Sequence, residues 1–354
     1  MKAKPQEILD ILSCDVNQII DRMKDLGEPA FRGRQLFEWL WKHGVESYDA
    51  ITVWPKALQA KMAKEWPIKR LQVIQKQVAT DGTTKLLLAL TDGQRVETVI
   101  LPHPYGYSVC VSSQVGCAMG CTFCASGLNG RIRQLSAGEI MDQLRYAEMT
   151  VRPHGHHVSR VDLMGIGEPL DNYDNVLKFM RLAHDEATYH LSYRHFTVST
   201  SGLVPAINRL SDEGLPITLA VSLHAPNDGM RGQLMPINRA YPLAKLIPAC
   251  EAYAQRTGRR ITYEYLLLKD VNDSPELAHE LVSLLKGSLC HVNLIPWNPV
   301  DEHQYQPSPM SAVRAFQRIV QDQGISCTIR KELGQEIDAA CGQLRLHEEE
   351  FLSP

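Results

Sequence analysis

The sequence of 354 residues predicts an α/β fold, in which a partial (β/α)6 barrel follows a small helical domain and a short β linker. From Tyr107 onward, short apolar runs that are typical of strands alternate with segments of helical periodicity, and this alternation indicates a parallel sheet. About six such units follow one another without an obvious closing element, which favours a partial barrel. A doubly wound open sheet is the alternative.

Residues 1–70 are predicted to form a helical N-terminal domain. Their apolar residues recur at spacings of three and four, as on one face of a helix: Ile8, Leu9, Ile11, Leu12, Ile19, Ile20 and Met23. The stretch from Phe31 to Lys42 mixes aromatic side chains with cations. Up to residue 90 there are 14 Lys and Arg against 11 Asp and Glu, so this part carries 14 − 11 = +3 and the remainder −6. So small an excess fits a solvated surface as well as a face that binds polyanions.

Residues 71–105 are predicted to form a β-hairpin linker. Three runs rich in β-forming residues are separated by Asp-Gly turns: Val73–Val78, Thr84–Leu90 and Val96–Leu101, with Asp81-Gly82 and Asp92-Gly93 between them. Pro102 and Pro104 then interrupt the pattern and mark the end of the linker.

Residues 106–354 are predicted to form the barrel. The expected strands are Tyr107–Ser112, Val161–Met164, His195–Ser199, Ile217–Ser222, Ile261–Leu267, His291–Ile295 and Cys327–Arg330. The expected helices fill the intervals, at 136–150, 173–187, 203–213, 242–257, 275–287 and 310–323. Functional residues of such a barrel are expected at the rim where the parallel strands end.

The composition is that of an ordinary folded, water-soluble protein, with 44% hydrophobic and 22% charged residues. The 37 Lys and Arg and the 40 Asp and Glu give a net charge of −3, which excludes a histone-like polycation but not a local basic face. No run of about 18 apolar residues predicts a membrane span, and the first residues lack the apolar core of a signal peptide. We therefore expect a cytoplasmic protein with no membrane partner.

The nine cysteines are odd in number and come without a secretory signal, which argues against a disulfide scaffold and favours metal ligation or redox chemistry. Three of them, Cys117, Cys121 and Cys124, form a C-x3-C-x2-C motif. Three thiolates are soft ligands that can hold three irons of a [4Fe–4S] cube and leave the fourth iron open to a small chelating ligand. A structural zinc site needs four ligands, and no fourth Cys or His lies close in the sequence.

Glycine and polar residues follow four of the predicted strands. They form the stretches Gly165-Ile166-Gly167-Glu168-Pro169, Ser199-Thr200-Ser201-Gly202, Ser222-Leu223-His224 and Pro296-Trp297-Asn298-Pro299. The glycines permit close backbone approach, and Glu168 offers an acceptor for an ammonium group. Any one stretch fits ordinary turn chemistry, but four of them on the rim that holds the cysteine motif predict a binding site.

The cysteine spacing, with the aromatic Phe123 before the third cysteine, resembles the radical S-adenosylmethionine (radical SAM) superfamily. The whole chain resembles the RlmN family of radical SAM RNA methyltransferases. The matching stretches span nearly the entire sequence: Phe31–Gln35, Asp81–Lys85, Val96–Pro102, Val111–Gln114, Gly165–Leu170, Val221–Pro226, Asn293–Pro299 and Asp338–Leu344. Ile166 and Ser126 replace residues that are more often Met and Thr in that family, and neither change removes a functional group.

This resemblance implies methylation of C2 of adenosine 2503 in 23S rRNA and of adenosine 37 in certain tRNAs, and it makes these RNAs partners. It implies a TIM-like radical SAM barrel and an N-terminal domain that resembles helix-hairpin-helix modules and serves RNA binding. It implies a [4Fe–4S] cluster on Cys117, Cys121 and Cys124, and contacts to S-adenosylmethionine (SAM) from Gly167, Glu168, Ser199, Ser222, Leu223, His224 and Asn298. A flavodoxin-like or similar electron donor, a thiol reductant and a monomeric state complete the expectation.

C2 of adenine is too electron-poor to attack the methyl group of SAM, whereas a carbon radical can add there. The resemblance implies that Cys341 takes a methyl group from one SAM, since a thiolate is the best side-chain nucleophile. A 5′-deoxyadenosyl radical from a second SAM removes a hydrogen atom from that methyl group, and the product radical joins Cys341 to C2. Cys110 then attacks Cys341, releases the RNA and forms a disulfide that an external thiol reduces. Glu97 matches the proton acceptor of the family.

Simpler interpretations are that Cys341 and Cys110 are core thiols and that Glu97 is a solvated strand residue. Four further cysteines are expected to be core thiols: Cys14, Cys250, Cys290 and Cys327. The nearest alternative function is that of Cfr, a related enzyme that methylates C8 of the same adenosine and shares the cluster and the cysteine pair. A glycyl-radical activase would need the cluster without Cys110 and Cys341, and an iron–sulfur RNA-binding sensor would need no catalysis.

Overall fold

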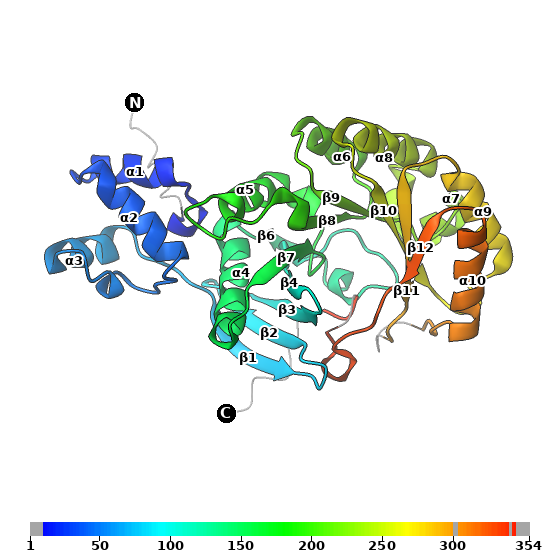
Figure 1. Ribbon diagram of the computed structural model, residues 1–354, viewed down its shortest axis with the longest axis horizontal. Helices are drawn as coiled ribbons and strands as arrows, with labels where there is room; N and C mark the ends of the chain where they lie inside the picture. The colour runs from blue at the N-terminus through cyan, green and yellow to red at the C-terminus, as the bar shows by residue number, and fades with distance from the viewer. Residues whose placement is uncertain (1–9, 300–303, 340–341, 345–354) are drawn as a thin grey trace.

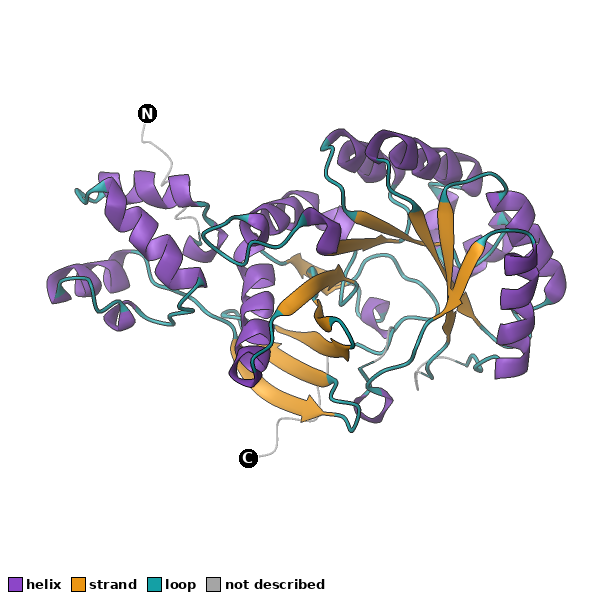
Figure 2. Ribbon diagram, viewed as in Figure 1, coloured by secondary structure: helices purple, strands orange, loops and turns teal. Residues whose placement is uncertain are grey.

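The computed structural model describes residues 10–299, 304–339 and 342–344. Helices α1 to α3 lie at one end of the molecule, and a strongly curved ten-stranded sheet occupies the rest (Figure 1). Most of the remaining helices pack on the outside of this sheet, so that its concave face looks inward (Figure 2). The inward face is therefore where a binding site is expected.

The N-terminal part folds into three helices, α1 (Val16–Asp25), α2 (Ala30–Trp41) and α3 (Lys56–Glu65). A capping box begins α1, in which the Asp15 side chain accepts from the Gln18 amide and the Gln18 side chain accepts from the Asp15 amide. Gly33 lies where α2 meets α1, and a Cβ at this position would come within 2.7 Å of the Ile20 Cα. Glycine thus allows α1 and α2, which lie in the part of the chain predicted to be helical, to pack closely.

Strands β1 (Gln72–Val78), β2 (Thr84–Ala89) and β3 (Arg95–His103) form an antiparallel ribbon. Both predicted Asp-Gly turns contain a glycine with positive φ, +85° at Gly82 and +84° at Gly93, which glycine adopts without strain. Strand β3 pairs antiparallel with β4 (Gly106–Cys110), so the ribbon continues the main sheet at its edge. The domain boundaries 1–70, 71–105 and 106–354 stay a prediction.

From β4 onward the sheet is parallel and follows the order of the chain through β7 (Val158–Leu163), β8 (Phe196–Thr200), β9 (Thr218–Ser222), β10 (Ile261–Leu267), β11 (Cys290–Pro296) and β12 (Ser326–Ile329). The main helices between them are α4 (Ala137–Val151), α5 (Tyr173–His184), α6 (Val204–Asp212), α8 (Leu243–Thr257), α9 (Pro275–Leu285) and α10 (Met310–Asp322). Within the described residues β4 does not pair with β12, so the partial barrel is confirmed. A doubly wound sheet would reverse its strand order, so that alternative is wrong.

Three short elements beside the cysteine motif do not follow from the sequence pattern. Strands β5 (Gln114–Gly116) and β6 (Arg131–Gln134) form a separate antiparallel pair, and α7 (Asp228–Leu234) follows β9. Their few residues are too short a window for periodicity to indicate a structure. Among the described helices, none has the length and apolar character to cross a membrane.

A buried group of charges joins the N-terminal helices to the barrel. Asp142 of α4 accepts from Arg70 Nη1 and from Arg145 Nε, both at 2.7 Å, and from the Leu71 amide at 2.8 Å. Arg70 also donates to the Leu40 carbonyl of α2 at 2.7 Å. Because all three charged side chains are buried, water competes little with these bonds, and they fix the N-terminal helices against α4.

Candidate active site

The cysteine motif lies on a loop between β5 and β6, at the rim where the parallel strands end. Gly116, with φ +72°, begins this loop, and a Cβ there would clash with the Gly130 carbonyl oxygen. The Cys117 amide donates to the same carbonyl at 3.0 Å. Glycine at position 116 therefore lets the two ends of the loop meet.

The loop is fastened on two sides. On one side the Thr122 amide donates to the Leu234 carbonyl at the end of α7, at 3.0 Å. On the other side the Ala125 amide donates to the Gly342 carbonyl of the C-terminal segment, at 2.9 Å. The cysteines are thus held between α7 and the segment that carries Cys341.

The three cysteines suit an iron–sulfur cluster. Burial raises the pKa of Cys117 to about 12, with smaller contributions from Glu168 and Cys124. Burial likewise raises the pKa of Cys121, and Cys124 and Cys117 raise it further. Thiols that oppose one another's ionisation need a cationic centre to hold them as thiolates. Within the described residues no three His, Cys, Asp or Glu side chains converge on a single ion, whereas in a cube each cysteine binds a different iron.

Glu168 is buried just after β7 and is held by backbone amides. Its Oε2 accepts from the Ser201 amide at 2.7 Å, and its Oε1 accepts from the Leu170 amide at 3.1 Å. Gly167 before it has φ +110°, and a Cβ there would come within 2.6 Å of the Gln114 side chain. Burial raises the pKa of Glu168, and the bonds from Ser201 oppose this rise. Each oxygen keeps a second lone pair, so the carboxyl can still accept from an ammonium group.

The predicted contacts on β8 and β9 meet in a cavity of about 130 Å³ beside the cysteine motif. Its lining includes Phe123, Cys124, Ser199, Ser222 and His224. The side chain of Leu223 is fully buried in the core, so only its backbone can reach a ligand. The structure therefore brings three of the predicted SAM contacts to one wall next to a predicted cluster ligand.

His224 is a neutral hydrogen-bond donor in this wall. Its Nδ1 accepts from the Leu266 amide at 3.0 Å, so the proton of the neutral ring lies on Nε2. Burial lowers the pKa of His224 to about 3, with a smaller effect from the charge of Arg231. The Phe123 ring meets the imidazole edge-on, with ring centroids 4.8 Å apart. His224 can position a ligand through Nε2–H but does not act as an acid near neutral pH.

Arg231 of α7 belongs to this site, although sequence reasoning missed it. Its side chain is fully buried, and its Nη2 donates to the Ser201 carbonyl at 2.7 Å and to the Ser222 carbonyl at 3.1 Å. Since the Ser201 amide donates to Glu168, Arg231 links the ends of β8 and β9 to that carboxyl. The charge of Arg231 also acts on Cys121. Its Nη1 also donates to Asn238 Oδ1 at 2.8 Å. No sequence signal could have found Arg231, because the fold alone brings it to these partners.

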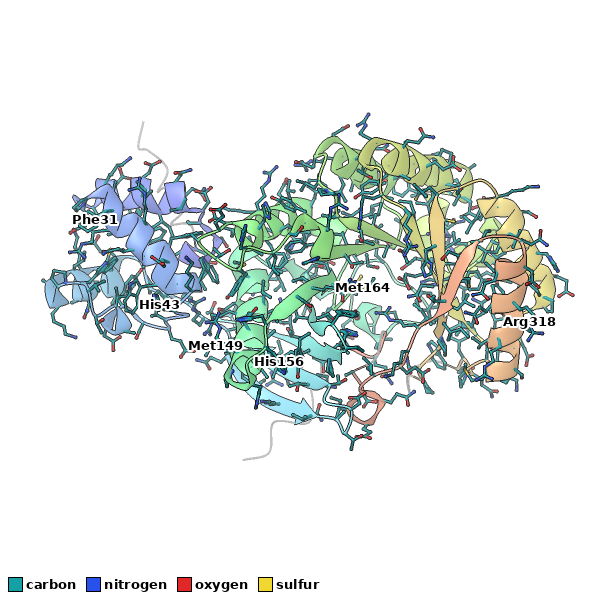
Figure 3. The ribbon with its side chains drawn as sticks, in the orientation of Figure 1. Phe31, His43, Met149, His156, Met164 and Arg318 are labelled. Atoms are coloured by element: carbon teal, nitrogen blue, oxygen red, sulfur yellow. The ribbon has the colours of Figure 1, made fainter. Side chains whose placement is uncertain are left out.

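A second cavity, of about 500 Å³, lies inside the curve of the sheet. Its wall includes Cys110 at the end of β4, Asn298 after β11, and Ala339 and Leu344 of the C-terminal segment. Met164 lines both cavities and lies within the curve of the sheet in Figure 3. The two cavities are therefore neighbours, one beside the cysteine motif and the other beside Cys110.

Cys110 faces the C-terminal segment. It packs in one buried apolar cluster with Val99, Ile166, Ala339 and Leu344. Ala339 lies two residues before Cys341 and Leu344 three residues after it. Cys341 itself lies outside the described residues, so the roles expected for the two cysteines stay predictions.

Glu97 of β3 is buried, so its interpretation as a solvated strand residue is wrong. Its Oε1 pairs with Lys85 Nζ of β2 at 3.2 Å, and Lys85 also donates to the Asp338 carbonyl at 3.3 Å. Because side chains alternate along a strand, Glu97 shares the face of Val99, which lines the larger cavity. The charge pair thus lies between the sheet and the C-terminal segment.

The four remaining cysteines lie away from both cavities. Cys14, Cys250 and Cys327 are buried, which confirms them as core thiols, and Cys290 is half-buried. Burial raises the pKa of Cys250 to about 12, so this thiol is a poor nucleophile at neutral pH.

Comparison with known proteins gives matches over almost the whole chain. Residues 111–282 match the Radical SAM superfamily, and residues 9–68 match the ribosomal RNA large subunit methyltransferase N-terminal domain. A probable dual-specificity RNA methyltransferase RlmN of Symbiobacterium thermophilum is 51% identical over 332 residues, 93% of this chain and 89% of the relative. The protein of the same name from Desulforamulus reducens is 49% identical over 338 residues, 95% of this chain and 96% of the relative.

Among solved structures, a radical SAM methyltransferase from Sphaerobacter thermophilus matches with a TM-score of 0.92 at 43% sequence identity. The match covers 95% of this chain and 98% of that chain. Family membership implies a [4Fe–4S] cluster and SAM, which the cysteine loop fits, and it rejects the activase and the non-catalytic sensor. The partial barrel, the cysteine loop and the matching relatives all point to the same family. The chain belongs to the RlmN family of radical SAM dual-specificity RNA methyltransferases.

Proposed function

We propose that the chain methylates C2 of adenosine 2503 in 23S rRNA and C2 of adenosine 37 in tRNAs. The observation that carries the proposal is the packing of Cys110 against Ala339 and Leu344, on either side of Cys341. A cysteine beside the segment that contains Cys341 suits a route in which the methyl group is first carried on sulfur. Such a route avoids any need for the electron-poor C2 to act as a nucleophile.

Cys117, Cys121 and Cys124 would hold the [4Fe–4S] cluster, which would supply the electron for cleavage of SAM to methionine and a 5′-deoxyadenosyl radical. Glu168 accepts from the ammonium group of SAM, and a cation there would offset the cost of burying this carboxylate. The remaining SAM contacts are Gly167, Ser199, Ser222, Leu223, His224 and Asn298, of which Ser199, Ser222 and His224 share the smaller cavity. Two SAM molecules are used in each turnover.

Cys341 carries the methyl group. Its thiolate displaces S-adenosylhomocysteine from the first SAM, so that a C–S bond forms to the methyl carbon. Loss of a hydrogen atom from this S-methyl group to the 5′-deoxyadenosyl radical gives a carbon radical that adds to C2. Glu97 accepts the C2 proton, and the [4Fe–4S] cluster, left oxidised by the cleavage of SAM, would take up the one electron that the adduct radical loses. Cys110 then attacks the Cys341 sulfur, so that an S–S bond forms, the S–CH2 bond breaks and the released carbon takes a proton.

The position of Glu97 supports its role as the proton acceptor. It is buried on the sheet face that lines the larger cavity, two residues from Val99, and Val99 is the register partner of Cys110. Lys85 compensates the charge of this buried carboxylate. A base in this place can serve a substrate that also meets Cys110.

The RNA, the reductants and the location complete the proposal. The N-terminal helices serve RNA binding, and they offer an exposed Phe31 with the Arg32 guanidinium 4.9 Å from its ring centroid (Figure 3). A flavodoxin-like or similar donor supplies electrons, and an external thiol reduces the disulfide between Cys110 and Cys341. We propose that the protein acts as a monomer in the cytoplasm.

Anaerobic turnover tests this function. Protein with a reconstituted cluster is given SAM, reductant and either an unmethylated 23S rRNA fragment or tRNA, and the digested nucleosides are measured by mass spectrometry. The expected product is 2-methyladenosine from both RNAs. Formation of 8-methyladenosine would instead indicate the Cfr-type alternative, and methylation of a different base would contradict the proposal.

A further inference from the structure

Glu264 is a buried carboxyl that the mechanism above does not use. It lies on β10 and lines both the larger and the smaller cavity. It therefore stands where the proposed SAM cavity meets the chamber beside Cys110. A charged or protonated group at that boundary has to be satisfied by a ligand or by its neighbours.

One oxygen of this carboxyl is fixed by its neighbours. Asn293, the register partner of Glu264 on β11, donates from Nδ2 to Oε2 at 2.8 Å, and Arg330 Nη1 lies 3.9 Å from the same oxygen. Thr328 on β12 donates in turn to Asn293 Oδ1 at 3.4 Å. Among the described residues Oε1 has no hydrogen-bond partner. The carboxyl is thus held in one orientation, with Oε1 open to a ligand and a second lone pair on Oε2 that can accept one more hydrogen bond.

The chemistry of this carboxyl fits a nucleobase edge. Burial raises the pKa of Glu264, the charge of Arg330 opposes the rise, and Asp162 adds to it. A carboxyl that carries a proton offers a donor and an acceptor side by side. Adenine offers the complementary pair on its Watson–Crick edge, an acceptor at N1 and a donor at the N6 amino group.

The larger cavity also suits a nucleotide. Its volume of about 500 Å³ lies within the usual range for small-ligand pockets. Arg160, Arg330 and Lys331 line it and offer cations to phosphate groups, beside two acids in addition to Glu264, which are Asp162 and Glu332. Glu264 would therefore meet its ligand in the larger cavity, although it also lines the smaller one.

We propose that Glu264 recognises the target adenine, with its carboxyl proton donated to N1 and its second oxygen accepting from the N6 amino group. The proposal rests on the proposed function, in which adenine is the substrate base. A hydrogen bond to N1 also withdraws electron density from the adjacent C2, which favours addition of a carbon radical there. Guanine reverses both groups, with a donor at N1 and an acceptor at C6, and is therefore rejected.

The test compares Glu264→Ala with Glu264→Gln, because the glutamine amide keeps a donor and an acceptor at the same place. With an unmethylated RNA fragment, kcat/KM is expected to fall about 10- to 100-fold for Glu264→Ala and to stay within about 3-fold for Glu264→Gln. Glu276→Ala is the matched control, since it removes an exposed carboxylate at the start of α9 that lines neither cavity. The control is expected to keep the wild-type value.

A change in the substrate then identifies the contact. The same RNA with purine riboside at the target position lacks the N6 amino group. The kcat/KM of the wild type is expected to be about 10-fold lower with this RNA than with the adenosine RNA, whereas the kcat/KM of Glu264→Ala is expected to be the same with both. Where turnover is too slow to measure, the dissociation constants of the two RNAs supply the same comparison. The dissociation constant of SAM and the formation of 5′-deoxyadenosine without RNA are expected to stay unchanged in all variants.

Two results would overturn the proposal. One is a Glu264→Ala variant that still discriminates adenine from purine as the wild type does. The other is a variant whose affinity for SAM falls as much as its methylation, which would make Glu264 a SAM contact. The proposed function is tested separately, by the identity of the methylated nucleoside that the wild type forms. The comparison of adenine with purine does not depend on that identity, because it can be made with whichever product forms.

Discussion

Two parts of the rim around the cavities are held in different ways. At the ends of β7, β8 and β9, buried polar groups form a hydrogen-bond network. In this network Arg231 donates to the Ser201 and Ser222 carbonyls, and the Ser201 amide donates to Glu168. The C-terminal segment from Lys331 to Leu344 is instead fastened partly at the surface. At the surface the Thr80 hydroxyl donates to Glu336 at 2.6 Å, and at a half-buried position the Gly334 amide donates to Asp81 Oδ2 at 2.9 Å.

The difference matches the tasks proposed for the two parts. Cleavage of SAM needs the cluster and SAM in one fixed geometry, which a buried hydrogen-bond network maintains. The cysteine of the C-terminal segment has to meet SAM, the base and Cys110 in turn. Attachment through solvent-exposed bonds costs little to rearrange, so it suits a segment with several partners.

The largest effect is expected where the buried network is broken. Arg231→Met leaves two carbonyls without their donor and removes a buried cation from the neighbourhood of Cys121. We expect stability to fall by about 3 kcal/mol in urea unfolding and 5′-deoxyadenosine formation to fall about 100-fold. Arg239→Met, at an exposed position on the same stretch of chain, is the control. Normal SAM cleavage by Arg231→Met would show that the rim does not depend on this network.

A smaller and more selective effect is expected at the junction with the C-terminal segment. Lys85→Met removes the cation that compensates the buried Glu97 carboxylate, and it also removes the bond to the Asp338 carbonyl. RNA methylation is expected to fall about 30-fold while 5′-deoxyadenosine still forms, because the SAM cavity is untouched. Lys76→Met, on the exposed face of β1, serves as the control. Equal loss of both activities would place Lys85 in the SAM-binding part instead.

Acid is expected to weaken the rigid part through His224. The pKa of His224 is about 3 in the folded chain and 6.5 in the unfolded chain. Between pH 3 and pH 6.5 the imidazole is therefore protonated in the unfolded chain and neutral in the folded chain. Stability is therefore lost as pH falls from 6.5 towards 3, by about 2 kcal/mol between pH 7 and pH 5. The wild type and His224→Gln are compared by urea unfolding at both pH values. An equal loss in the two proteins would exclude His224 as the source.

The smallest effect is expected at the exposed attachment. Glu336→Gln weakens the contacts to the Thr80 amide and hydroxyl, both of which are solvent-exposed. Methylation is expected to change less than about 3-fold and stability less than about 1 kcal/mol. Steady-state methylation and thermal unfolding check this. A loss as large as that of Lys85→Met would mean that the surface bonds, and not the buried pair, fix the segment.

Much of this architecture follows from local sequence. The alternation of apolar strands and amphipathic helices predicts β4, β7 to β12 and the main helices between them, because each of these elements carries its own periodicity. The Asp-Gly turns predict β1 to β3 for the same reason, whereas the pairing of β3 with β4 depends on contacts between strands. The spacing of Cys117, Cys121 and Cys124 predicts a cluster because all three ligands come from one short loop.

What the sequence could not predict depends on groups brought together by the fold. Arg231 reaches the Ser201 carbonyl, 30 residues away, and no pattern of residue types indicates a bond to backbone. Glu264 is a carboxyl on a buried strand, and its partners Asn293 and Arg330 come from β11 and from the residue after β12. The pairing of Glu97 with Lys85 is likewise a contact between neighbouring strands, so sequence alone left Glu97 open to a solvated interpretation.

The central claim is that Cys110 resolves a covalent link between Cys341 and the RNA. It is tested most directly by Cys110→Ala, incubated anaerobically with SAM, reductant and unmethylated RNA and analysed by denaturing gel and intact mass spectrometry. We expect a stable protein–RNA adduct, joined through Cys341 by one methylene carbon, to accumulate in place of methylated RNA. Recovery of only free protein and free RNA, or normal release of 2-methyladenosine-containing RNA, would contradict the claim.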